Sequence, residues 1–142
     1  MGNVQMRNPV LQMARPALAA TALVAAAGVA QAVPLSYTNF TPINGWEKFA
    51  SAVRAPGGAL DTNGIVHLRG VLDQATGSNT QMFTLPVEFR PNKVVYLPIG
   101  VSNGHTGRIT VYPTGEVYVN AFGNQSNAQD FTGLDGIIYS LN

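Results

Sequence analysis

Side chains that could act as nucleophiles, general bases or metal ligands are few in this chain. Cysteine is absent, and histidine occurs only as His67 and His105. Without thiolates or a group of histidines, the sequence offers no cysteine nucleophile and no zinc, iron–sulfur or multi-histidine site. We therefore expect neither a metal nor another cofactor.

Catalysis by carboxylates is not expected either. Glycoside hydrolysis needs two carboxylates that face the same bond, and the spacing of the seven acidic residues selects no such pair. Most of them lie near expected strand ends or turns, where Asp accepts hydrogen bonds from the backbone. No P-loop, G-x-G-x-x-G turn or H-E-x-x-H sequence occurs,. We expect no G-x-S-x-G elbow and no alternation of strands and helices, which excludes an α/β-hydrolase on motif and fold together. We predict that the protein is not an enzyme.

Aromatic and amide side chains indicate non-catalytic binding. In an expected hairpin, Tyr112, Tyr118 and Asn120 share one face, and Phe122 follows them. The next residues, among them Asn124, form an uncharged stretch that is rich in amides. Flat rings beside amide groups suit the faces and the hydroxyls of a sugar.

A neighbouring loop adds His105 and Arg108, which could contact an anion or a sugar. The predicted ligand site therefore consists of Tyr112, Tyr118, Asn120, His105, Arg108 and Asn124. The competing interpretation is that this aromatic face packs on another subunit or another sheet, and we place a subunit contact before a sugar contact.

A subunit interface is expected at several apolar positions. The segment from Val94 to Val101 is almost wholly apolar, which suits a strand covered on both faces or one at a subunit contact,. The only tryptophan is expected to be a core or interface anchor. The predicted interface residues are Trp46, Val95, Leu97, Ile99 and Phe122.

The elements that must position these residues are short strands. From residue 33 onward, Gly, Pro and Asn divide the chain into pieces rich in Val, Ile, Tyr, Phe and Thr, which favour strands,. We predict an all-β fold, a single antiparallel β-sandwich of jelly-roll type. The expected strands are 43–49, 65–72, 81–85, 94–101, 108–112, 116–122 and 136–141.

Side-chain alternation and turn residues refine this prediction. In the strand 65–72, Val66 and Leu68 share one face and His67 the other,. Pro98 indicates an edge strand or a bulge, because proline cannot donate to a sheet. Residues 113–115 form the expected hairpin turn.

The first third of the chain differs from the rest. Residues 17–32 are nearly all Ala, Leu and Val, and Ala30-Gln31-Ala32 has the pattern of a signal-peptide cleavage site,. The same segment could be a helix that is retained, since Ala and Leu favour helices. We divide the chain into a signal-like or docking segment at 1–32, an extended linker at 33–42 and the sandwich at 43–142. The apolar run is too short for a membrane span.

Charge excludes further classes. The 142 residues carry a net charge of +1, and only 11% are charged. We expect no nucleic-acid partner that binds through bulk electrostatics and no disordered charged tail.

Several sequence pieces, taken in order, resemble the C-terminal β-sandwich module of bacteriophage minor tail, tail-fibre and baseplate receptor-binding proteins. The resemblance covers about residues 43–142. It rests on Gly45-Trp46, Gly64-Ile65-Val66-His67-Leu68-Arg69-Gly70, Phe83-Thr84-Leu85-Pro86 with Arg90-Pro91, Gly115-Glu116-Val117-Tyr118-Val119, and Leu134-Asp135-Gly136-Ile137-Ile138-Tyr139. Within these pieces, Gly70 is expected to allow a bulge or a close backbone approach.

The resemblance implies a homotrimer in a virion that binds a host-surface saccharide or serves as a structural tip. Residues 1–42 would then dock onto other virion proteins. Because no long stalk precedes the module here, we expect a small minor tail, tail-tip, baseplate or head-decoration component. The alternative is a secreted bacterial sandwich that binds glycans or lies at the cell surface.

Overall fold

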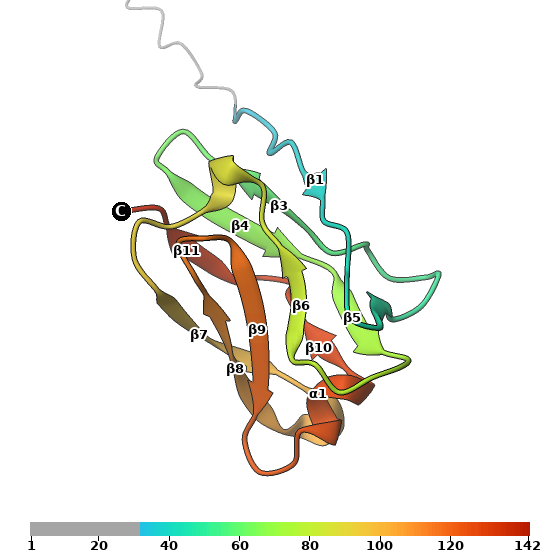
Figure 1. The fold of residues 1–142 in the computed structure, drawn as a ribbon. Helices are drawn as coiled ribbons and strands as arrows, with labels where there is room; N and C mark the ends of the chain where they lie inside the picture. Colours follow the sequence, from blue (N-terminus) through green and yellow to red (C-terminus); the bar gives the residue numbers. More distant parts are fainter. Residues whose placement is uncertain (1–31) are drawn as a thin grey trace, which may run out of the picture. The chain divides into compact units, whose positions relative to one another are not determined.

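Short antiparallel strands build three sheets in the computed structural model, which describes residues 32–142 (Figure 1). The predicted signal-like or docking segment lies outside the described residues, apart from Ala32. Sheet A has the order β1 (Thr38–Asn39), β3 (Gly57–Leu60), β4 (Ile65–Arg69), β11 (Ile138–Ser140). Sheet B has the order β10 (Thr132–Gly133), β5 (Val71–Gln74), β2 (Trp46–Lys48). Sheet C has the order β6 (Gln81–Thr84), β9 (Glu116–Ala121), β8 (Thr106–Val111), β7 (Val95–Gly100).

Helical structure is confined to three short elements among the described residues. They are η1 (Val87–Phe89), η2 (Ser102–Gly104) and α1 (Ser126–Asp130). The sequence prediction missed α1, because five residues are too few to show a helical repeat of apolar positions,.

The sheets pack as a sandwich around one apolar core (Figure 1). Alternate residues of β8 and β9, such as Ile109 and Val119, are fully buried, as are Val66 of β4 and Leu72 of β5. The Phe40 ring lies 5.1 Å from the Phe83 ring, centroid to centroid, and extends this core. The prediction of an all-β antiparallel sandwich is confirmed.

A junction at Gly70 carries the chain from sheet A to sheet B. β4 ends just before Gly70, β5 begins just after it, and the chain returns from β10 to β11 beside it. The Gly70 amide donates to Asp135 Oδ1 over 3.0 Å, and the Leu134 amide donates to the Gly70 carbonyl over 2.8 Å. Two segments that are far apart in sequence therefore hold the same sheet corner.

Only glycine fits at this corner. Gly70 has a φ of +99°, and a Cβ there would lie 2.5 Å from the carbonyl oxygen of Ala55. The expected close backbone approach at Gly70 is confirmed. The single predicted strand 65–72 is wrong, because this residue divides it into two strands of different sheets.

A second contact closes one end of sheet C. The Leu85 amide donates to the Gly115 carbonyl over 2.8 Å, and Arg90 Nε donates to the Leu85 carbonyl over 2.9 Å. Gly115 has a φ of +102°, and a Cβ there would lie 2.6 Å from Arg90 Nε. The predicted hairpin turn at 113–115 is thus confirmed, and the side chain of Arg90 covers it.

The other strand predictions differ in detail. β7 is the edge strand of sheet C, which agrees with the expectation from Pro98. The linker predicted at 33–42 is wrong at its centre, because Thr38–Asn39 pairs with β3 and the Phe40 side chain is buried. The sandwich therefore includes residues before 43.

Substitution of Gly70 by alanine should destabilise the fold strongly, because it combines an unfavourable φ with a clash against backbone. Gly64 is the matched control, since it has a φ of +77° and a Cβ there would meet no atom within 4 Å. We expect Gly64→Ala to cost about 1–2 kcal/mol and Gly70→Ala about 3–5 kcal/mol in the free energy of unfolding. Urea denaturation measures both. Equal losses would contradict a steric role for Gly70.

Removal of the Tyr139 hydroxyl should also destabilise the protein. This buried hydroxyl donates to the Phe89 carbonyl over 2.6 Å, and burial raises the pKa of Tyr139. Tyr139→Phe leaves a buried carbonyl without its donor, which costs about 1–3 kcal/mol. Tyr96→Phe is the control, because its ring is 60% exposed, and it should change stability by less than about 0.5 kcal/mol. A neutral Tyr139→Phe in thermal or urea unfolding would contradict this account.

Candidate functional site

The outer face of sheet C carries the aromatic residues that the sequence placed on one side of the hairpin. Residues of β8 and β9 alternate, so Val117 and Val119 are buried while Tyr118 and Asn120 point away from the core. Tyr112 follows β8 on the same side and is 39% exposed. The predicted sharing of one face by Tyr112, Tyr118 and Asn120 is confirmed.

One hollow on this face lies beside the hairpin turn. The Tyr112 and Tyr118 rings meet edge to face, with centroids 5.7 Å apart and an interplanar angle of 83°. With Thr114 and Glu116 they line a hollow of about 230 Å³. This arrangement offers ring faces and edges together with a hydroxyl and a carboxylate.

Glu116 is charged at neutral pH. The Thr114 hydroxyl donates a hydrogen bond to its carboxylate, and this bond is the largest cause that lowers the pKa of Glu116 below its ordinary value. Arg90 lowers this pKa further through its charge. A lone ionised carboxylate accepts hydrogen bonds from ligand hydroxyls but supplies no acid–base pair.

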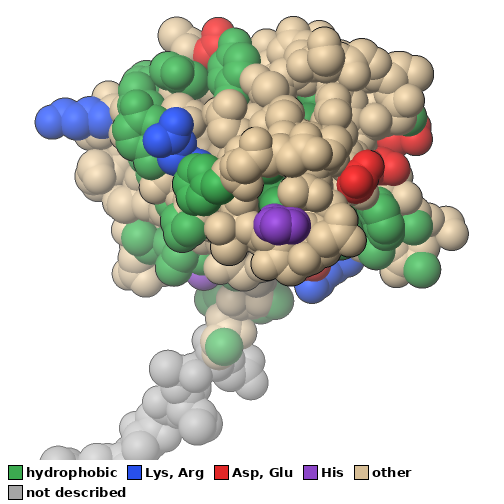
Figure 2. All heavy atoms as spheres, turned by 90° about the horizontal axis from the view of Figure 1, so that it is seen from below, with side chains coloured by type: hydrophobic (Ala, Val, Ile, Leu, Met, Phe, Trp, Pro, Cys, Tyr) green, Lys and Arg blue, Asp and Glu red, His purple; other side chains and the backbone are tan. Residues whose placement is uncertain are grey.

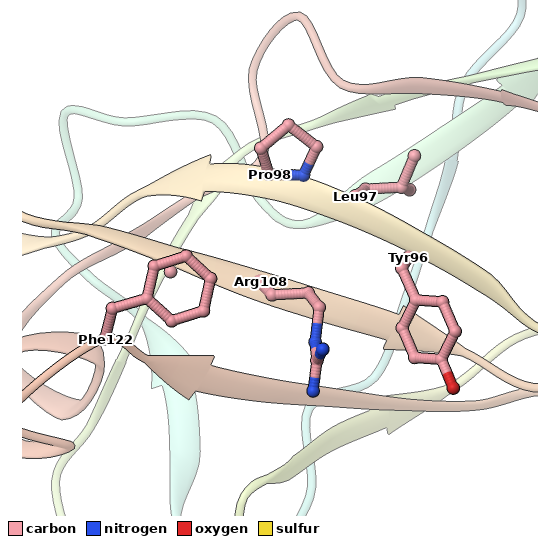
Figure 3. A pocket seen from close by; sticks show the side chains of 6 residues that line it. Tyr96, Leu97, Pro98, Arg108 and Phe122 are labelled. Atoms are coloured by element: carbon pink, nitrogen blue, oxygen red, sulfur yellow. The ribbon is translucent and has the colours of Figure 1, made fainter.

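A second hollow lies on the strands β7 and β8 and reaches Phe122 (Figure 3). It also measures about 230 Å³, and its lining includes Tyr96, Leu97, Pro98 and Arg108. The Arg108 guanidinium lies 4.9 Å from the centroid of the Tyr96 ring. Figure 3 shows Arg108 between the rings of Tyr96 and Phe122.

The two hollows lie along neighbouring rows of one sheet face. Across β7, β8 and β9, Tyr96 pairs with Thr110, and Thr110 pairs with Tyr118. Two residues along β7, Pro98 pairs with Arg108, which pairs with Asn120. Tyr96 was absent from the predicted site. Tyr96 and the buried Ile99 lie three residues apart in β7, so their side chains point to opposite faces of the strand,. This alternation could have placed Tyr96 on the outer face from the sequence.

Two predicted ligand residues, His105 and Asn124, lie in connections between elements and not in the strands of sheet C. His105 is exposed and lies between η2 and β8, where its amide donates to the Ser102 carbonyl. Asn124 Oδ1 accepts a hydrogen bond from the Ser126 amide over 3.1 Å. That amide oxygen holds the turn before α1, which is the ordinary role of Asn at such a turn.

The interface prediction is wrong for Trp46 and Ile99. Each side chain is only 4% exposed within the chain itself, so a partner cannot cover it. Trp46 Nε1 donates to the Asn79 carbonyl over 2.8 Å, which satisfies the buried indole. Val95 and Leu97 are partly buried against the core, because they share the inner side of β7 with Ile99.

Phe122 differs from those four residues. It is 57% exposed, so it remains available to a partner or a ligand. The outer side of β7 is also uncovered in the chain, since Tyr96 and Pro98 are exposed. Figure 2 shows one face of the molecule, on which the charged side chains are few and stand apart.

Residues 100–104 have the G-x-S-x-G spacing of a hydrolase elbow, which the sequence prediction overlooked. The structure places Ser102 in η2, between two antiparallel strands, and not at a turn from a strand into a long helix. Ser102 Oγ donates to Asn127 Oδ1 over 3.3 Å. The residue therefore lacks the setting of a hydrolase nucleophile.

His67 forms a hydrogen bond with Asp61 that the sequence did not reveal. Its Nε2 lies 3.2 Å from Asp61 Oδ2, while Asp61 Oδ1 accepts hydrogen bonds from the Asn63 and Ile65 amides. Among the described residues, no serine or threonine hydroxyl is hydrogen-bonded to this pair. The pair closes the β3–β4 turn.

Within residues 32–142, no group of three His, Cys, Asp or Glu side chains could hold a metal ion. No helix in this part of the chain is long and apolar enough to cross a membrane. Comparisons of the chain with protein-family models, with curated proteins and with solved structures found no match.

Replacement of Asp61 by asparagine should destabilise the protein in a pH-dependent way. Hydrogen bonds from the Ile65 amide and from His67 lower the pKa of Asp61 below its ordinary value of 3.8. A carboxyl group with a lowered native pKa stabilises the fold above its unfolded pKa, and this contribution is lost as the pH falls through the native pKa. The stability difference between wild type and Asp61→Asn should therefore be full above about pH 5 and shrink below about pH 4.

Urea unfolding at a series of pH values checks this prediction. Asp130→Asn is the control, because Asp130 is exposed and forms no side-chain hydrogen bond within the described residues. A difference for Asp61→Asn that stays constant down to pH 3 would contradict the role of the charged Asp61 carboxylate.

Proposed function

We propose that this protein is a non-catalytic component of a bacteriophage virion, in the tail tip, baseplate or head decoration. In this proposal the sandwich assembles as a homotrimer and binds a host-surface saccharide on the outer face of sheet C. Residues 1–42 attach it to other virion proteins. The observation that carries the saccharide role is the row of exposed Tyr96, Tyr112 and Phe122 on this face, with Arg108 and Asn120 between them.

The chemistry of the face supports recognition in preference to catalysis. Exposed aromatic side chains that gather on one surface mark an interaction site. Rings stack on the apolar faces of a sugar, and amides and hydroxyls meet its hydroxyl groups. Glu116 is the only carboxylate that lines the hollow beside Tyr112 and Tyr118, so this hollow offers no pair for hydrolysis,.

The sequence pieces behind the phage resemblance support the virion role. The piece that ends at Gly70 contacts the piece that begins at Leu134. The piece that contains Leu85 contacts the piece that begins at Gly115, and Arg90 covers that contact. The resemblance thus concerns residues that hold the sandwich together.

A second candidate is an exported bacterial protein that binds glycans with the same face. Ala30-Gln31-Ala32 favours it as a cleavage site,. Native mass spectrometry of the full chain, expressed in a host that can export it, separates the two candidates. A trimer that keeps residues 1–32 supports the virion component, and a monomer that begins at Val33 supports the exported protein and overturns the virion proposal.

Tyr118→Ala should weaken saccharide binding and leave the fold nearly intact. We expect Kd to rise about tenfold, which is about 1.4 kcal/mol, for the strongest ligand on an array of bacterial surface saccharides. The loss of the contact with Tyr112 should lower the unfolding free energy by only about 1 kcal/mol.

Tyr37→Ala is the matched control, because Tyr37 lies before β1 and stacks on Arg69 instead. It should leave the affinity unchanged. A large fall in melting temperature or the loss of the oligomer in Tyr118→Ala would make Tyr118 a packing residue and contradict the proposed site.

A further inference from the structure

We propose that the hollow lined by Tyr96, Arg108 and Phe122 binds a sugar residue that carries a carboxylate, and that Arg108 binds this carboxylate. The inference rests on the proposed saccharide role and names the class of saccharide. It concerns a different hollow from the one beside Tyr112 and Tyr118, so the two can be tested separately.

Arg108 is a cation without an acidic partner among residues 32–142. Within this part of the chain, Arg54 forms an ion pair with Asp135, and Asp61 contacts His67. The Arg108 side chain is exposed and forms no hydrogen bond to another described residue. Its donors are therefore open to a ligand.

Tyr96 orients this cation. The guanidinium lies 4.9 Å from the ring centroid, which is a cation–π distance,. Stacking holds the planar group against one side of the hollow and leaves its N–H edge free. A guanidinium edge binds a carboxylate through two parallel hydrogen bonds, which a lysine ammonium cannot reproduce.

The remaining lining is apolar. Leu97, Pro98 and Phe122 are apolar residues of the lining, and Phe122 is 57% exposed without a ligand (Figure 3). A ligand that fits must carry one anionic group and an apolar face that can stack on a ring. A uronic or sialic acid residue has both, in a single six-membered ring.

The size and the charge of the hollow agree with one such residue. Its volume of about 230 Å³ is below the roughly 300–1,000 Å³ of sites for drug-sized ligands. A single cation matches the single charge of a carboxylate, whereas a phosphate carries more charge and three acceptor oxygens. The observations therefore favour a carboxylate.

We expect the hollow beside Tyr112 and Tyr118 to bind a second residue of the same saccharide. Tyr96 and Tyr118 flank Thr110 on adjacent strands, so they stand about 10 Å apart at the usual strand spacing,. One acidic oligosaccharide could place its charged residue at Arg108 and a neutral residue in the hollow beside Tyr112 and Tyr118.

The test is an NMR titration of the full chain with methyl glucuronide, methyl glucoside and glucose 6-phosphate. We expect glucuronide to shift the amide signals of Gly107, Arg108 and Phe122 and to bind about tenfold more tightly than glucoside. Equal affinity for glucuronide and glucoside would overturn the inference. Tighter binding of the phosphate would also overturn it and identify a phosphate site.

Variants of Arg108 distinguish the effect of its two parallel hydrogen bonds from the effect of its positive charge. Arg108→Lys should lose about fivefold in glucuronide affinity and Arg108→Gln about tenfold. Lys93→Gln is the matched control, because it removes one exposed positive charge just before β7, and it should leave the affinity unchanged. An equal loss in Lys93→Gln would mean attraction by net charge only and would contradict the site.

The titrations also distinguish failure of the Arg108 inference from failure of the proposed saccharide role. If Tyr118-dependent binding of neutral saccharides persists while glucuronide shows no preference, only the inference about Arg108 fails. If no saccharide binds either hollow, the saccharide role itself fails.

Discussion

The structure depends on the corner where Gly70 meets Leu134 and Asp135. At this point two segments pass between sheets A and B. The Gly70 amide donates to the Asp135 carboxylate, and the Leu134 amide donates to the Gly70 carbonyl. A buried strand end without such partners would cost about 1–3 kcal/mol for each unsatisfied group. Asp135 also forms an ion pair with Arg54, which ties the segment before β3 to the same corner. The alternation of side chains along the strands then fixes the core.

Because the core is closed by other side chains, the aromatic rings on the outer face of sheet C are not needed for core packing. Thr110 is only 4% exposed although it points outward, because it lies between its cross-strand neighbours Tyr96 and Tyr118. Binding sites on strands vary less in position than sites on loops. Tyr112 and Tyr118 contact each other edge to face, and Arg108 lies over the Tyr96 ring. Such contacts reduce the side-chain freedom that would be lost on binding a saccharide.

The sequence predicted the sandwich, the hairpin and its aromatic face because these follow from alternation and from turn residues such as Gly115. It could not show that one strand becomes two at Gly70, because the switch depends on contacts with a segment 64 residues later in the chain. Trp46 and Ile99 were predicted at an interface because the sequence does not show what covers an apolar side chain. A side chain buried by its own chain looks identical in sequence to one buried by a partner. The Asp61–His67 pair and the approach of Arg108 to Tyr96 are likewise matters of spatial packing.

The central claim is that the outer face of sheet C is open in the native protein. Nitration of the full chain with tetranitromethane, mapped by mass spectrometry, tests it directly, because the chain contains five tyrosines in different settings. We predict that Tyr96 and Tyr112 are nitrated in the native protein, with Tyr139 protected by burial as the internal control. Protection of Tyr96 and Tyr112 in the oligomer, with modification only after dissociation, would show that the face is a subunit contact and contradict the account.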